Sequence, residues 1–570
     1  MDDKVLEPVK YYERQGKQEH LDNINAHFDA LVETSGVDIE ANRQTVEKWK
    51  SEQEVIASLS KVLKKFKIFR ILLIVGIVFG AILTISSFGQ FEVSVLSGII
   101  MLILGAGAVI GCTMLMLKKV NPVIKDTDKV LQDHLAVAKQ LENEGWAQMQ
   151  SLNDLFTDDD CVRLIEKTLP DFAFEKNFSV DQEKLFVEKY DFQDPQTDEC
   201  SMVDTLSGKY AGNPFLFGRR RVHSMGTHTY HGSLTIQWTE TYQDSNGKTQ
   251  TRTKTQTLHA SVTKPKPYYN LNTFLAFGNQ AAPNLSFSRT TKHTENLSEK
   301  ALERKIKKGE RQLQKQAQKS IKNGGNFQEM ANSEFDVLFG ATDRDNEVEF
   351  RLMYTPLGQR STVELLKDSN HYGDDFDFIK SGKYNVVLSD HAQKWKMHIF
   401  ANDYKHFNFE EIKTRFVGMN ETYFKSIFFD FAPFFCVPAY LEEPCEALEG
   451  NELYSSNYTY YEHEVMANAL DYRSFVHEES CTEAILKTQT VNTENGNDIV
   501  AVTAYSYAGI DRIDYISVKG GDGNYHPVPV PWIEYIPVNK TSYIVVSDNI
   551  SLDEYTSVYY HGIGAGIIEN

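Results

Sequence analysis

The chain has 570 residues, 41% of them hydrophobic and 24% charged, so it is long enough for several folded domains. Its formal net charge is -20, and residues 431–570 hold 21 Asp and Glu against only 5 Lys and Arg. This acidic balance argues against a nucleic-acid-binding protein, because phosphates attract clustered Lys and Arg, and six scattered cysteines without a CxxC pair fit a reducing compartment.

Residues 1–67 are predicted to form N-terminal cytoplasmic helices. Apolar residues recur at three- and four-residue spacing from Leu21 to Leu31, and Asp38 is placed to cap a second helix. Farther along, apolar residues between Val120 and Leu141 predict a helix over residues 119–157. Because these two helices flank the same apolar segment, we expect them to pair as a stalk.

Residues 68–118 contain two apolar runs without charge, at 71–88 and 93–117. A hydrocarbon core requires about 20 apolar residues of helix, so both runs are predicted to be transmembrane helices that form a hairpin. Each run contains a GxxxG pattern, which places small residues on one face for close helix packing: Gly76 and Gly80, then Gly107 and Gly111.

Basic residues stand only on the outer flanks of this hairpin. The stretch between the runs holds Glu92 and no Lys or Arg, whereas the outer flanks hold Lys64, Lys65, Lys67, Arg70, Lys118 and Lys119. Positive residues favour the cytoplasmic side. The sequence therefore predicts a cell-membrane protein with two membrane helices and both termini in the cytoplasm.

Residues 158–430 are predicted to form an α+β cytoplasmic domain. Alternating residues over Ser233–Tyr242 and Lys248–Val262, around Asp244–Gly247, predict a β-hairpin. A basic helix is predicted at 298–322, with nine Lys and Arg and three Glu. A solvated surface, the anionic inner leaflet and an acidic partner are the three interpretations of its charge.

The following block combines short helices and strands. It is predicted to contain a helical turn at Phe335–Phe339, a helix that starts at Thr355 and Pro356, and strands at Glu347–Tyr354, Tyr384–Leu388 and Lys394–Phe400. Residues 431–570 are predicted to form an acidic, β-rich C-terminal domain with a short helix near Glu462–Leu470. The expected fold class is an α+β membrane protein, with N-terminal helices, the hairpin and stalk, and then α+β and β-rich cytoplasmic domains.

The segment FDVLFGATDRDNEVEFRLMYTPLGQRSTVELL, which begins at Phe335, resembles a bacterial family catalogued as domain of unknown function 3137. The resemblance covers residues 60–415 in layout, and specific residues around Asn346–Pro356. It implies two membrane helices near the N-terminus, a stalk and a cytoplasmic α+β domain, and no catalytic residue. It also suggests a membrane-associated partner, such as a LemA-like protein.

Two groups of side chains are candidates for chemistry. His223, His228 and His231 have HxxxxH and HxxH spacing, which offers imidazole nitrogens for a metal ion. Glu462 and His463, with His477 farther on, form the densest cluster of acids and imidazoles and are the candidate catalytic residues. No cofactor-binding motif stands out, so no cofactor is predicted.

Three functions remain open from the sequence. The first is a membrane-anchored cytoplasmic interaction or scaffold module that binds a protein or envelope-associated partner at the inner face. The second is a metal-dependent hydrolase that uses the Glu462, His463 and His477 region. The third is a component of an oligomeric channel or transporter, against which the uncharged membrane helices argue.

Overall fold

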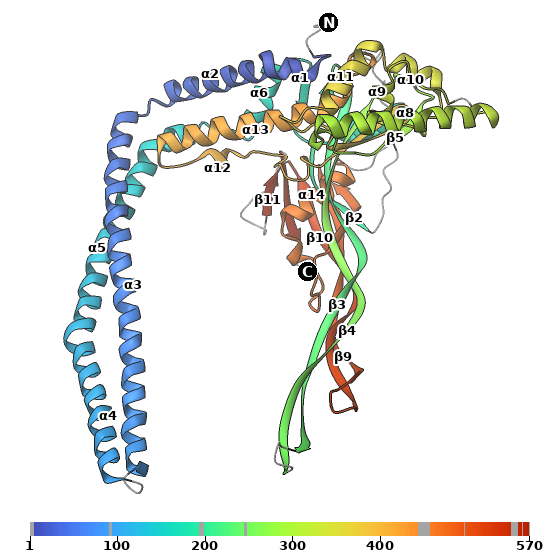
Figure 1. Ribbon diagram of the computed structural model, residues 1–570. Coiled ribbons are helices and arrows are strands. Elements are labelled where there is room, and N and C mark those ends of the chain that lie inside the picture. Colours follow the sequence, from blue (N-terminus) through green and yellow to red (C-terminus); the bar gives the residue numbers. More distant parts are fainter. Residues whose placement is uncertain are drawn as a thin grey trace. The chain divides into compact units, whose positions relative to one another are not determined.

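The computed structural model describes residues 5–90, 94–192, 199–243, 248–325, 327–442, 457–494, 496–548, 557–560 and 562–568 (Figure 1). The chain divides into two compact units. The helical unit comprises Leu21–Asp160 and Ile399–Asn420, and the sheet unit comprises Met1–His20, Cys161–His398 and Glu421–Asn570. Long N-terminal helices form a hairpin and two antiparallel sheets follow, which confirms the mixed α+β class.

Long helices build the first unit. They are α2 (Lys17–Ser35), α3 (Ile39–Gln90), α4 (Val95–Leu115), a π-helical turn η2 (Met116–Val120), and α5 (Asn121–Asn153), together with α12 (Ala401–Tyr404) and the start of α13 (Phe409–Phe435). As predicted, Asp38 caps α3, because its carboxylate accepts a hydrogen bond from the Ala41 amide at 2.9 Å.

The predicted pairing of the two flanking helices is confirmed. Buried residues of α5 recur every seven positions at Ile124, Leu131 and Ala138, and they pack with Ile56 and Leu63 of α3. This is the spacing of a left-handed helix pair. A 2.6 Å contact between His134 Nδ1 and a Glu52 carboxylate oxygen joins the same two helices.

Helices α3 and α4 are long and apolar enough to cross a membrane. They approach most closely at Gly80 and Gly105: a Cβ atom on Gly80 would lie 2.9 Å from the Gly105 carbonyl oxygen, and one on Gly105 would lie 2.8 Å from that of Gly80. Such contacts are tighter than carbon–oxygen packing allows, so both positions require glycine. Most of the other apolar side chains of the two helices are exposed.

A disulfide can test this helix pairing. A Cβ atom built on Gly76 lies 3.1 Å from Cys112 Sγ, and a disulfide places one Cβ about 3 Å from the other sulfur. We therefore expect Gly76→Cys to form an intramolecular disulfide with Cys112 under mild oxidation, detected by mass spectrometry of the linked peptides. Gly89→Cys, on the same helix and with open space around its Cβ, is the control that should not cross-link to Cys112. Absence of the linked peptide in the first variant would contradict the pairing.

Two antiparallel sheets build the second unit. The seven-stranded sheet has the order β1-β2-β3-β4-β7-β6-β5, from β1 (Phe172–Glu175), β2 (Cys200–Tyr210), β3 (Asn213–Gln243), β4 (Thr249–Gly278), β5 (Ser286–Arg289), β6 (Phe376–Ser381) and β7 (Tyr384–Ser389). The five-stranded sheet has the order β11-β12-β10-β9-β8, from β8 (Ile485–Glu494), β9 (Asn497–Lys519), β10 (Tyr525–Ser547), β11 (Ser557–Tyr560) and β12 (Ile563–Ile568).

Each sheet extends into a long hairpin (Figure 1). The predicted β-hairpin is confirmed as β3–β4 and is longer than expected, while its Asp244–Gly247 turn lies outside the described residues. Strands β9 and β10 form the second hairpin. The two hairpins pack through Ile236, Leu258 and Val528, so each covers an apolar face of the other.

Helix α14 (Tyr460–Ala469) contributes to the cores of both sheets. Its Tyr461 and Val465 pack with residues of β2, β3 and β4. Met466 and Ala467 pack with residues of the five-stranded sheet. A short helix was predicted here, and it is buried on both sides although it carries polar residues, because Glu462 and His463 have partners in the surrounding strands.

Two predicted strands are wrong. Residues 347–354 form helix α10 (Glu347–Met353) instead, because the Asn346 side chain caps it and the buried Glu347, Phe350 and Met353 are three residues apart. Residues 394–400 form no strand, although their burial alternates. Their carbonyl groups accept hydrogen bonds from side chains: Trp395 from Arg219, and Met397 from Tyr423.

The remaining helices of the sheet unit are short, except for one. They are α1 (Pro8–Tyr11), η1 (Tyr12–Gly16), α6 (Asp160–Thr168), α7 (Val180–Tyr190), η3 (Thr294–Asn296), α8 (Glu299–Lys322), α9 (Ser333–Phe339), α11 (Pro356–Leu366), η4 (Pro438–Leu441) and η5 (Tyr472–Ser474). Helices α8, α9 and α11 confirm the predicted elements, and Thr355 caps α11 through the Gly358 amide.

Candidate functional site

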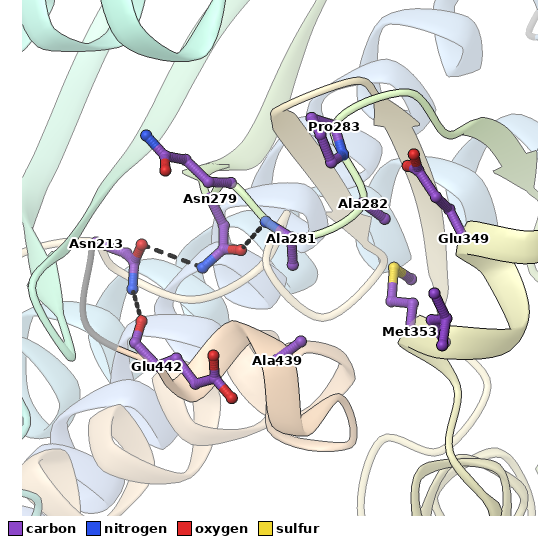
Figure 2. A pocket seen from close by; sticks show the side chains of 11 residues that line it. Asn213, Asn279, Ala281, Ala282, Pro283, Glu349, Met353, Ala439 and Glu442 are labelled. Carbon is purple, nitrogen blue, oxygen red and sulfur yellow. Dashed lines mark hydrogen bonds between the residues drawn. The ribbon is translucent and has the colours of Figure 1, made fainter. Parts of the chain in front are cut away.

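A pocket of about 460 Å³ lies where four separate segments of the sheet unit meet (Figure 2). Its lining residues come from the start of β3, the loop after β4, helix α10 and the end of η4: Asn213, Asn279, Gln280, Ala281, Ala282, Pro283, Glu349, Leu352, Met353, Ala439 and Glu442. Figure 2 shows Asn213 hydrogen-bonded to both Asn279 and the Glu442 carbonyl oxygen. These bonds tie three of the four segments together.

Strained backbone surrounds this pocket. The two-residue turn between β2 and β3 places Ala211 at φ 46 and Gly212 at φ 74, and the Ala211 carbonyl accepts a hydrogen bond from Asn213. Ala282 in the loop after β4 has φ 52. Alanine in the left-handed region carries a cost that the surrounding structure must offset, and such positions cluster at functional sites. Two of the five described non-glycine residues with positive φ therefore lie beside this pocket.

A buried lysine, Lys380, holds the loop after β4 that lines this pocket. The Lys380 ammonium is almost fully buried, and it donates hydrogen bonds to the carbonyl groups of Ala281 at 2.9 Å and Gly382 at 2.6 Å. Burial lowers the pKa of Lys380 to about 7, against the opposing attraction of the Glu349 carboxylate. Lys380 therefore holds the pocket loop in place and does not itself line the pocket.

The lining of the pocket favours a cationic ligand with an apolar neighbour. Glu349 and Glu442 supply carboxylates, and none of the described lining residues is Lys or Arg. Two oxygens of Glu349 accept hydrogen bonds from Asn284, which fixes that side chain. Leu352, on the same helix, is 72% exposed beside them. This combination suits an ammonium or guanidinium group next to an apolar side chain.

The structure places Glu462, His463 and His477 among different partners. Glu462 is buried and accepts hydrogen bonds from the Phe178 amide and the Thr205 hydroxyl, both at 2.8 Å. His463 lies 3.1 Å from Asp498 of the other sheet. His477 follows η5, where its Nδ1 accepts a hydrogen bond from the Glu479 amide. Glu462 and His463 thus connect α14 to the two sheets, which is a structural role.

The three candidate metal ligands on β3 are not brought together. The register of β3 against β4 is continuous, so His223 and His231 lie on one face and His228 on the other. A strand rises about 3.3 Å per residue, which separates His223 from His231 by about 26 Å. Among the described residues, no group of three or more His, Cys, Asp or Glu side chains is arranged to hold a metal ion.

The glycines and the basic flanks of the helical hairpin also have defined places. Gly76 and Gly80 of α3 face α4, whereas Cβ atoms on Gly107 and Gly111 would meet open space, and the close contact on α4 belongs to Gly105. The flanking basic residues are all exposed: Lys64, Lys65, Lys67, Arg70, Lys118 and Lys119. Next to these basic residues in the sequence, Leu63 of α3 and Val120 of the segment after α4 belong to one buried apolar cluster.

We compared the chain with models of protein families, with curated proteins and with solved structures, and none of the three comparisons found a match.

Sequence reasoning missed the pocket because its residues are distant in the chain. Asn213 and Asn279 are separated by two long strands, and Glu349 belongs to a segment for which a strand was predicted. The available signal was the richness of the 211–214 and 278–284 segments in Gly, Asn and Pro, which marks turns. It predicts loops, but it does not indicate which loops meet.

Proposed function

We propose that this chain is a membrane-anchored interaction protein. In this proposal α3 and α4 cross the cell membrane, both termini are cytoplasmic, and the sheet unit binds a polypeptide partner at the inner face through the pocket beside α10. The family resemblance adds that the partner is a membrane-associated protein, with LemA-like proteins as the first candidates.

One observation carries the membrane anchor. Apolar side chains of α3 and α4 point outward along both helices, among them Leu72, Phe79, Leu96 and Ile103, each more than 60% exposed. Water-facing surfaces of soluble proteins rarely include apolar patches of this extent. A hydrocarbon environment removes that cost, and the uncharged runs have the length that a bilayer core requires.

The proposed topology can be tested with thiols. Gly89 lies near the end of α3 with open space around it, so a Gly89→Cys variant should react with a membrane-impermeant maleimide in intact cells. The native Cys481 is exposed in the sheet unit and serves as the internal control, because it should react only after permeabilisation. Labelling of both thiols, or of Cys481 alone, in intact cells would contradict the proposed orientation.

The partner site is supported by the chemistry of the pocket and by the apolar face beside it. Val348 and Leu352 are exposed on α10, four residues apart and therefore on one side of the helix. Together with Glu349 and Glu442 they offer apolar contact next to negative charge. A partner segment with a Lys or Arg beside an apolar residue matches both features.

Photo-crosslinking tests this site in the intact chain. A photoreactive amino acid at Leu352 should capture a specific protein in cells, and Glu349→Lys with Glu442→Lys should reduce the yield by removing the charge complementarity. The same amino acid at Val491, which is 59% exposed on β8, is the matched control and should not capture that protein. Equal capture from both positions, or none from Leu352, would refute the proposed partner site.

A further inference from the structure

Helix α8 presents its positive charge on one side only. Leu313 is buried beneath it, and Gly309 packs so closely that a Cβ atom there would lie 2.4 Å from Val337 of α9. This contact fixes which face of α8 is turned toward solvent. The helix carries nine Lys and Arg and three Glu.

The positions of these charges follow from helical geometry. At about 100° per residue, eight of the nine basic residues fall within an arc of about 120°. All eight are exposed: Lys300, Arg304, Lys307, Lys308, Arg311, Lys315, Lys319 and Lys322. Glu299, Glu303 and Glu310 lie together on another side of the helix, outside this arc. We call the eight residues the basic face of α8.

Eight positive charges on the basic face stand against three glutamates on the same helix, of which only Glu303 precedes a basic-face residue, Lys307, by four positions. None of its eight residues takes part in an ion pair among the described residues. Arg304, Lys308 and Arg311 repeat at four- and three-residue spacing, and Arg311, Lys315 and Lys319 repeat at four-residue spacing. Like charges at this spacing repel and destabilise a helix. The repulsion between these positive charges destabilises α8, and an anion bound from outside the chain would reduce it.

The positive potential extends into a neighbouring pocket of about 640 Å³ that Lys292, Lys305 and Lys308 line. Burial and, to a lesser extent, the positive charges of Arg289 and Lys305 lower the pKa of Lys292 to about 8, against the opposing attraction of Asp374 and Asp336. Lys305, the one basic residue outside the basic face, donates hydrogen bonds to Lys292 O and Thr294 Oγ1. An anion bound here would relieve this crowding of positive charge.

We infer that the basic face of α8 binds the surface of a bilayer that contains anionic phospholipid. The inference rests on the proposed membrane anchor, which keeps such a surface at a high effective concentration. A row of charges about 33 Å long matches a uniformly charged plane better than a compact acidic site on a protein. Lys supplies six of the eight charges, and Lys binds phosphate as a point charge without fixed geometry.

The test uses the full chain reconstituted in two kinds of vesicle. One contains phosphatidylcholine alone and the other adds phosphatidylglycerol, each with a photoactivatable form of its own lipid. We expect lipid adducts on peptides from residues 299–322 only in the vesicles with phosphatidylglycerol, and we expect the yield to fall as salt rises. Each basic residue replaced by Gln should weaken the attraction about fivefold.

Two matched variants sharpen the result. The first neutralises half of the basic face, and the second neutralises four exposed lysines elsewhere in the sheet unit. They are Lys308, Arg311, Lys315 and Lys319 changed to Gln, and Lys209, Lys394, Lys396 and Lys519 changed to Gln. Only the first should lose the adducts. Hydrogen exchange of the α8 amides checks that this helix remains folded.

Alternative outcomes separate the two proposals. If alkaline extraction leaves the chain in the vesicles but α8 acquires no adducts that depend on phosphatidylglycerol, the inference about α8 is wrong and the membrane anchor stands. If alkaline extraction removes the chain, the proposed anchor itself fails. Capture of an acidic polypeptide by α8 in cells, without lipid adducts in vesicles, would also overturn the lipid assignment.

Discussion

Arg344→Met is expected to lower the free energy of unfolding of the sheet unit by about 3–5 kcal/mol. The Arg344 guanidinium is fully buried and pairs with Asp336 at 2.6 Å and with Glu347 at 2.8 Å. The rings of Phe327 and Phe350 lie 4.6 and 4.5 Å from it. The substitution would leave the buried Asp336 without its cation and Glu347 with only the longer contact to Arg351, which is the costly way to break an ion pair. Urea unfolding of the detergent-solubilised chain measures the loss.

The matched control is Arg351→Met. Arg351 is half-exposed, and its Nε lies 3.8 Å from the same Glu347, so its removal should cost about 1 kcal/mol or less. Adding Asp336→Asn to the Arg344→Met variant should recover part of the lost stability, because the second change removes one unpaired charge. An unchanged unfolding midpoint in Arg344→Met would contradict the buried charge cluster.

His391→Phe is expected to have a similarly large effect that depends on pH. His391 lies between two carboxylates, with Nδ1 at 2.7 Å from Asp375 and Nε2 at 3.3 Å from Asp430. Burial disfavours the imidazolium, but the attraction of Asp430 and Asp375 outweighs it and raises the pKa of His391 well above the ordinary value. The Tyr372 ring stacks on the imidazole at 3.7 Å, and phenylalanine preserves that stacking.

The raised pKa fixes the direction of the pH dependence. The stabilisation by His391 is complete below its unfolded-state pKa of about 6.5 and is lost as the pH rises through the higher folded-state pKa. We therefore expect His391→Phe to cost about 3–5 kcal/mol near pH 6 and less at alkaline pH. Unfolding at a series of pH values measures this difference.

His293→Asn is the control for that experiment, because asparagine tolerates the left-handed backbone of this position, at φ 46. The His293 side chain is 53% exposed, and its nearest carboxylates are 3.6 and 3.9 Å away, so little stability depends on its charge. A His391→Phe effect that stays constant across the pH series would mean that the imidazole contributes packing and no charge.

The strand predicted at residues 347–354 shows where local sequence reasoning reached its limit. The segment alternates polar and apolar residues, but it also repeats apolar residues at helical spacing, so its pattern fits two structures. Two contacts stabilise the helix over the strand: Asn346 caps α10, and Arg344 pairs with the buried Glu347. A short segment of mixed periodicity takes its structure from its tertiary partners.

The candidate site shows the same limit at larger scale. Local rules predicted the ends of α8 and α11 and the β3–β4 hairpin, because caps, breakers and alternation act within a few residues. The pocket joins segments from Asn213 to Glu442, and no local rule relates residues that distant. Likewise, Glu462 and His463 are adjacent in the chain, and this proximity led to the prediction of a catalytic site. In the structure the two side chains contact different sheets.

The sequence by itself determined the length, apolarity and basic flanks of the two long helices, the stalk periodicity and the mixed α+β class. These are properties of contiguous residues. The spacing of apolar residues decides which side chains share one face of a helix, and the length of an apolar run decides whether the helix can span a bilayer. Only the tertiary structure decided that Gly105 packs against Gly80, that Arg344 pairs with Asp336 and Glu347, and which face of α8 is exposed. Those facts depend on contacts between separate elements, whose geometry is set when the whole core packs.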